Sequence, residues 1–143
     1  MKKLVIAIAL IGCQMVVYSQ GRNPERREQI EAQRSAYITS RVGLSADESR
    51  SFWPVYNKMR DELDANRENY LKVIRPRVPM DSRSDAEIKE AMEARFKMEE
   101  DRLRIERRYQ QEFLKVLSIR QLGKLYQAEE EFKKEVLKEL RRR

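Results

Sequence analysis

Leu44-Ser45-Ala46-Asp47-Glu48 opens one amphipathic stretch of this sequence, and Leu117-Ser118-Ile119-Arg120-Gln121 opens another in the same way. A Ser just before a helix accepts a hydrogen bond from a free N–H of the first turn, and a Glu or Gln three residues later reaches back to the N–H of the cap. The Leu ahead of each Ser stands where a hydrophobic staple begins, with Ser49 or Leu122 as its partner. We therefore predict that each box starts a helix and that the second box is the better staple.

The composition favours long helices over sheets. The chain has 143 residues with four Gly and four Pro, 38% of its residues are charged, and its mean hydropathy is −0.81. Few helix breakers and many Glu, Lys, Arg, Gln and Leu favour helices, and the length fits one domain. So large a charged fraction leaves only a narrow apolar seam, and helices with such a seam pair as hairpins, coiled coils or dimers. We predict an all-α fold, a long helical hairpin of about four helices.

Residues 1–19 have the layout of a secretory signal. Lys2 and Lys3 precede an apolar run, Leu4–Val17, and the small polar stretch Tyr18-Ser19-Gln20 follows. The run is too short, and becomes polar too soon, for a membrane span. We predict a signal peptide at 1–19 with cleavage before Gln20, export to the periplasm, and a single domain at 20–143 without stable membrane insertion.

A second interpretation of the same segment is open. Leu10-Ile11-Gly12-Cys13 resembles a lipobox, in which Cys13 would be lipidated and would anchor the protein. The apolar run continues past Cys13 to Val17, which favours ordinary cleavage.

The residue inventory excludes several classes of function. The sequence has no His, and Cys13 is its one Cys, so a chain cut before Gln20 lacks the commonest bases, nucleophiles and soft metal ligands. We expect no enzyme activity, no cofactor and no metal site. The formal charge of +7 stays positive after Lys2 and Lys3 are removed. An exported basic protein does not meet chromosomal DNA, so we expect no nucleic-acid partner, and instead acidic protein segments, lipid head groups or lipopolysaccharide.

Local signals predict the helix boundaries. Asn23 is the expected cap of a helix that runs to Val42, and Gly43 supplies the left-handed residue that ends it. The first box then starts a second helix, from about Ala46 to Ile74.

The second helix contains Pro54, whose ring and missing N–H predict a bend near Arg50–Trp53. The stretch from Arg75 to Pro79 cannot continue a helix. Ser84 and Glu87 form a further capping pair that starts a long third helix. The second box either interrupts that helix or starts a fourth.

Apolar spacing predicts the buried face of each helix. The first two helices carry Ile30, Tyr37, Ile38 and Val42, then Phe52, Val55, Tyr56, Met59, Leu63, Tyr70, Val73 and Ile74. The main stripe of the third helix is Ile88, Met92, Phe96, Leu103, Phe113 and Leu117, and a second line of Met98, Ile105, Tyr109 and Val116 widens it. After the second box come Leu122, Leu125, Phe132, Val136 and Leu140.

These features together resemble the Spy/CpxP family of exported bacterial stress proteins, known for LTxxQ boxes. The run Phe52-Trp53-Pro54-Val55-Tyr56-Asn57 after the first box looks especially like the Bacteroidetes branch, often described as sensors tied to extracytoplasmic-function sigma factors. The boxes here carry Ser45 where the family has Thr and Glu48 where it has Gln, and both replacements still cap a helix.

The resemblance implies a helical hairpin that forms a curved antiparallel homodimer. It implies ATP-independent protection of unfolded or partly folded exported proteins. The alternative that it implies is a regulatory protein that binds a membrane stress-signalling component, such as the periplasmic domain of a sensor kinase or an extracytoplasmic-function sigma and anti-sigma system. The metal-sensing branch of the family uses His ligands, which this chain lacks.

A few residues are candidates for contact with a client or partner. The aromatic run from Phe52 to Tyr56 is predicted to pack in the core, with Trp53 off the main stripe and partly exposed. Among the methionines, Met59 and Met92 fit core stripes, whereas Met80 in a loop is the best candidate for an adaptable contact. Arginines on such helices are by default a solvated face, and Arg75 and Arg77 are the basic candidates beside the loop.

Overall fold

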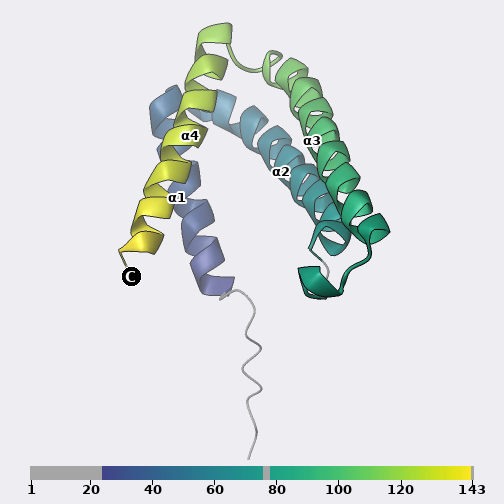
Figure 1. Ribbon diagram of the computed structural model, residues 1–143. Helices are drawn as coiled ribbons and strands as arrows, with labels where there is room; N and C mark the ends of the chain where they lie inside the picture. Colours follow the sequence, from purple (N-terminus) through teal and green to yellow (C-terminus); the bar gives the residue numbers. More distant parts are fainter. Residues whose placement is uncertain (1–23, 76–77, 143) are drawn as a thin grey trace, which may run out of the picture.

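The computed structural model describes residues 24–75 and 78–142, and this part of the chain folds into helices without strands (Figure 1). The helices are α1 (Pro24–Val42), α2 (Ala46–Ile74), α3 (Asp85–Phe113) and α4 (Ile119–Arg141), with a short 3-10 turn, η1 (Met80–Ser82), between α2 and α3. The all-α prediction is confirmed, as are the predicted ends of the first two helices. The second box starts a fourth helix. The predicted cap Asn23 and the signal at 1–19 lie outside the described residues.

All three capping boxes form in full. In the first, Ser45 Oγ accepts from the N–H of Glu48 at 3.2 Å while Glu48 Oε2 accepts from the N–H of Ser45 at 2.8 Å. The boxes that start α3 and α4 repeat both hydrogen bonds. Gly43 ends α1 with φ 72°, and its N–H donates to the carbonyl oxygen of Thr39. The helix starts at Ser45, Ser84 and Ser118 and the helix end at Gly43 therefore have the capping chemistry that the sequence predicts.

The four helices form an arch with two legs (Figure 1). Helix α1 packs against α4 in one leg, and α2 packs against α3 in the other. The partners in each leg run antiparallel, and the legs meet where α1 turns into α2 and where α3 turns into α4. The arch is therefore two helix pairs joined at one end, the apex.

The apolar core lies at the apex, where all four helices meet. Its buried members are Ile38, Val42, Phe52, Tyr56, Tyr109, Phe113, Leu117, Leu122, Leu125 and Ala128. Phe52 and Phe113 lie with ring centroids 5.4 Å apart. Trp53 makes T-shaped contacts with Phe52 and Tyr56 and stays partly exposed. The prediction that the aromatic run packs in the core is confirmed. Leu117 and Leu122, the predicted staple partners of the second box, are both buried in this core.

The predicted main stripe of the third helix is wrong for three of its six residues, whereas Phe113 and Leu117 are buried as predicted. Met92, Phe96 and Leu103, called the outer row below, are 60%, 63% and 49% exposed. Helix α3 instead buries Ala91, Ala94 and Tyr109, of which Tyr109 belongs to the second line, together with Phe113 of the main stripe. The small alanines let the helices approach closely enough for the buried Asn66 amide to donate to the backbone oxygen of Met98 at 2.9 Å. That close contact decides which of the two apolar lines is buried. No helix in the described ranges is long and apolar enough to cross a membrane.

Candidate ligand-binding groove

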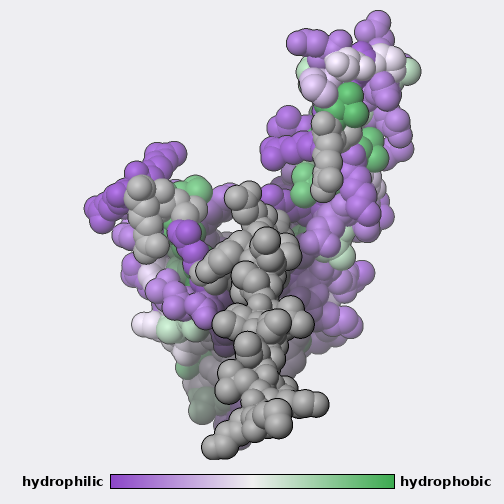
Figure 2. All heavy atoms as spheres, turned by 90° about the horizontal axis from the view of Figure 1, so that it is seen from below, coloured by the Kyte–Doolittle hydropathy of each residue, from purple (hydrophilic) through white to green (hydrophobic). Residues whose placement is uncertain are grey.

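A groove of about 970 Å³ runs between the two legs, and all four helices line it. Seen from below, the far ends of the legs stand apart as separate masses, and hydrophilic residues cover most of their surface (Figure 2). The groove exists because the core joins the legs at the apex alone. It is the feature of the described chain best suited to holding another molecule.

The lining of the groove is both apolar and charged. Its apolar members are Met59, Leu63, Leu71, Ile74, Met98, Tyr126, Phe132, Val136 and Leu137. Its cations are Arg34, Arg60, Arg67, Arg75, Arg95, Arg102 and Lys133, and its carboxylates are Asp64, Glu99, Glu106, Glu129 and Glu130. A ligand in this groove therefore meets apolar contacts and an excess of positive charge.

Most of these carboxylates are already engaged. Glu99 and Glu106 both accept from Arg102, at 2.8 Å and 2.6 Å, and the hydrogen bond with Glu99 is the main reason why the pKa of Arg102 is raised. Glu129 accepts from the hydroxyl of Tyr56. Within the described part of the chain, Arg102 is the one groove cation that forms an ion pair with a carboxylate of the groove lining.

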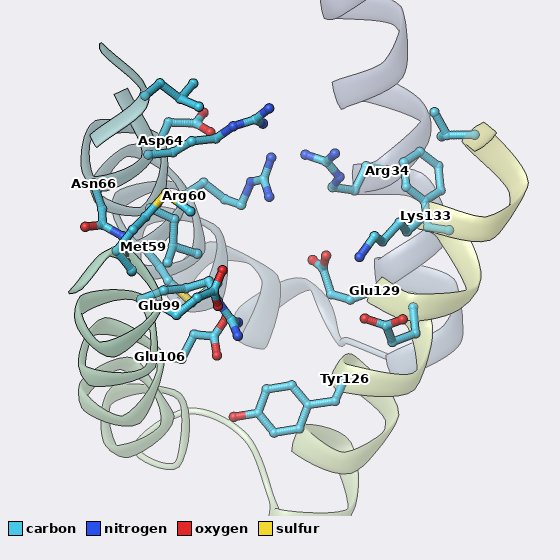
Figure 3. Close-up of a pocket in the computed structure, with 18 of the residues that line it drawn as sticks. Arg34, Met59, Arg60, Asp64, Asn66, Glu99, Glu106, Tyr126, Glu129 and Lys133 are labelled. Carbon is cyan, nitrogen blue, oxygen red and sulfur yellow. Dashed lines mark hydrogen bonds and ion pairs between the residues drawn. The ribbon is translucent and has the colours of Figure 1, made fainter. Parts of the chain in front are cut away.

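The cations, in contrast, are mostly uncommitted. Within the described part of the chain, Arg60, Arg67, Arg95 and Lys133 form no ion pair. Arg34 is held by Glu31 at 2.8 Å and lies over the ring of Phe132 at 5.5 Å. Its buried Nε has no hydrogen-bond partner. Arg34, Arg60 and Lys133 extend into the space between the legs from three different helices (Figure 3).

The bond between Tyr56 and Glu129 ties the legs together at the top of the groove. Tyr56 belongs to α2 and Glu129 to α4. Burial, followed by the negative charge of Glu129, raises the pKa of Tyr56 well above its ordinary value. The phenol therefore stays protonated and remains a donor at neutral pH.

The two sequence boxes meet at the apex and do not line the groove. The side chain of Gln121 donates from Nε2 to Glu48 Oε1 at 3.0 Å. The hydrogen bond from the N–H of Ser45, together with that from Gln121, lowers the pKa of Glu48. Leu44 packs against the core beside them. The box residues are thus structural here, and they also link α2 to α4.

The candidate contact residues do not form one site. Trp53 packs at the apex, Met80 is exposed in η1 at the far end of a leg, and Arg75 lines the groove beside the end of α2. Arg77 lies outside the described residues. Sequence reasoning singled out neither Arg60 nor Lys133. Arg60 follows Tyr56 by four residues, and Lys133 follows Glu129 by four residues. This spacing identifies the two cations once the Tyr56–Glu129 bond is known.

Comparison with protein-family models, with curated proteins and with solved structures found no match for this chain. The Spy/CpxP resemblance therefore rests on the boxes and on the run after the first of them. Among the described residues, no group of His, Cys, Asp and Glu side chains is arranged to hold a metal ion.

Proposed function

We propose that this protein is an exported holdase of the Spy/CpxP type, a chaperone that binds partly unfolded proteins without ATP. The observation that carries this proposal is the open groove, whose lining combines apolar side chains with uncommitted cations. Such a lining suits unfolded chains, which expose both apolar and charged groups and have no fixed shape.

The proposed mechanism is transient capture. Positive charge speeds the encounter with acidic segments, in a way that salt weakens. Scattered apolar contacts then hold the client, with each buried Leu-sized side chain contributing about 1.5–3 kcal/mol at most. Flexible Met59 and Met98 adapt to clients of different shape. Because no single contact dominates, release needs no energy source.

The proposal places the protein in the periplasm after cleavage before Gln20. Mass spectrometry of the exported protein tests this directly. A start at Gln20 supports it, and a lipidated start at Cys13 would make the protein an anchored lipoprotein.

The decisive test is suppression of client aggregation by the purified protein, at low salt and then along a salt titration. We expect protection at a modest molar excess and a loss of protection as salt rises. In the groove variant Leu137→Gln, the concentration for half protection should rise about fivefold, since the lost contact is worth about 1 kcal/mol. Ile119→Gln is the matched control, because Ile119 is an exposed apolar residue of α4 outside the groove.

Two outcomes would count against a holdase. One is a complete lack of protection with several unrelated clients at several-fold excess. The other is capture of a single stoichiometric partner from the envelope, which would favour the regulatory alternative, a protein that binds a stress-signalling component of the membrane.

A further inference from the structure

Two facing cations lie one helical turn from the bond that joins the legs, on the side away from the apex. Tyr56 of α2 donates to Glu129 of α4 at the top of the groove. Residues four apart share a helix face, so Arg60 continues the face of Tyr56, and Lys133 continues that of Glu129. Both line the groove and point into it (Figure 3). The turn nearer the apex carries a hydrogen-bond donor and its acceptor, whereas the turn of Arg60 and Lys133 carries two positive charges.

Arg34 of α1 adds a third cation at the same level. Its guanidinium lies over Phe132, next to Lys133 in sequence, and Figure 3 shows its side chain directed toward Arg60 across the groove. The charges of Arg34 and Arg60 both act on the Tyr56 hydroxyl and oppose the rise of its pKa, so both lie near that group. Stacking and Glu31 fix the orientation of Arg34, yet its buried Nε has no hydrogen-bond partner.

Carboxylates lie near these cations, but within the described part of the chain none of them forms an ion pair with Arg60 or Lys133. Glu129 accepts from the neutral hydroxyl of Tyr56 and keeps its negative charge, and Glu31 holds Arg34 from outside the groove lining. Asp64 lines the groove four residues after Arg60. Glu130 also lines the groove but forms no ion pair with the described part of the chain. Like charges on opposite legs repel, and an anion between them would turn that repulsion into attraction from both sides. Guanidinium groups match phosphoryl oxygens in shape as well as charge.

We propose that a compact phosphoryl anion with two or more negative charges binds between Arg34, Arg60 and Lys133 and bridges the two legs. The site takes its residues from three helices and both legs, so occupancy holds the legs at a fixed separation. A monovalent salt anion satisfies one cation at a time and only screens the others. This site does not depend on the holdase function, because its ligand is a small anion and its effect is on the arch itself.

Calorimetric titration of the purified protein with sodium tripolyphosphate, at constant ionic strength set by sodium chloride, tests the site. We expect saturable binding at one site per chain. Arg60→Gln and Lys133→Gln should each weaken it by about tenfold, and the controls Lys58→Gln and Lys124→Gln should change it by less than about twofold. The controls are exposed cations of the same two helices outside the groove. Circular dichroism verifies that each variant keeps its helices.

Bridging has a readout of its own. Small-angle scattering should give a smaller radius of gyration for the wild type with tripolyphosphate than without it, and no such change for Arg60→Gln. Absence of saturable binding overturns the proposal. So does an equal loss of affinity in the control variants, which would mean diffuse attraction to a basic protein. If the protein does not suppress aggregation but binds tripolyphosphate in this pattern, the holdase proposal is rejected and the anion-site proposal stands. The two proposals can therefore be rejected separately.

Discussion

Gln121 and Glu48, the last residues of the two sequence boxes, are hydrogen-bonded to each other at 3.0 Å. Each also caps its own helix, through Ser118 and Ser45 respectively. A local signal for a helix start thus doubles as a contact between α2 and α4, which begin 73 residues apart. The two boxes that repeat in the sequence therefore also contact each other where the two legs join.

This double role predicts unequal costs for two similar changes. Glu48→Ala removes half of a capping box and the link to Gln121, whereas Glu87→Ala removes half of a capping box alone. We expect Glu48→Ala to lower the free energy of unfolding by more than Glu87→Ala does. Urea unfolding followed by circular dichroism measures both. Equal losses would mean that the link between the boxes adds nothing to stability.

The orientation of α3 predicts opposite behaviour for two of its phenylalanines. Phe113 is buried in the core and Phe96 is mostly exposed. We expect Phe113→Ala to cost about 3–5 kcal/mol of unfolding free energy, and Phe96→Ala to change it by about 0.5 kcal/mol or less at low protein concentration. Chemical denaturation of the two variants decides the matter. A large cost at Phe96 would restore the stripe expected from the sequence.

Two glycines should respond to alanine with opposite signs. Gly43 has φ 72°, where a Cβ is strained, whereas Gly123 lies inside α4, and a Cβ added at either meets no atom within 4 Å. Gly43→Ala should lower the unfolding free energy by about 1 kcal/mol, and Gly123→Ala should raise it by about 0.5–1 kcal/mol. Thermal melts of both variants are sufficient. A stabilised Gly43→Ala protein would contradict the left-handed turn.

The pair of Tyr109 and Glu62 predicts how stability depends on pH. The hydrogen bond from Tyr109, then the charge of Arg108, lowers the pKa of Glu62. The contribution of Glu62 to the free energy of unfolding is therefore fully present above the ordinary Glu pKa of 4.5, and it is lost as pH falls through the lowered pKa. Burial raises the pKa of Tyr109 to about 12 from 10.0, so its contribution is lost as pH rises between these values.

Unfolding by urea at a series of pH values tests both limits. Tyr109→Phe should flatten the acid limb, because the pKa of Glu62 then moves back toward its ordinary value, and it should remove the alkaline loss due to this residue. Tyr126→Phe is the control, because no carboxylate in the described ranges accepts a hydrogen bond from Tyr126. Identical acid limbs in the wild type and in Tyr109→Phe would sink this account.

The outer row of α3 predicts the oligomeric state. Met92, Phe96 and Leu103 lie outside the groove lining and are 60%, 63% and 49% exposed. We propose that a second copy of the chain covers them. Phe96→Glu should then shift sedimentation from dimer to monomer, while Phe96→Leu keeps the dimer. A wild-type protein that sediments as a monomer at all accessible concentrations rejects this interface.

Local capping chemistry made the helices predictable, and apolar spacing predicted the buried faces of α1, α2 and α4 but not that of α3. Ser45, Ser84 and Ser118 act on their own first turns, so their effect can be read within four residues. The third helix carries two apolar lines, and the choice between them depends on Asn66 and Ala94, which meet only after α2 and α3 pack. The groove depends on longer-range information still. Arg34, Arg60 and Lys133 lie far apart in sequence, and only the arch brings them together.

Confinement of the core to one end of the molecule has a mechanical consequence. Helix α2 has 29 residues, which at 1.5 Å per residue makes a rod of about 43 Å. A swing of about ten degrees where the rods are joined displaces their free tips by about 7 Å. As in a pair of tweezers, a small change of angle at the joined end of the helices produces a large change in the distance between their tips.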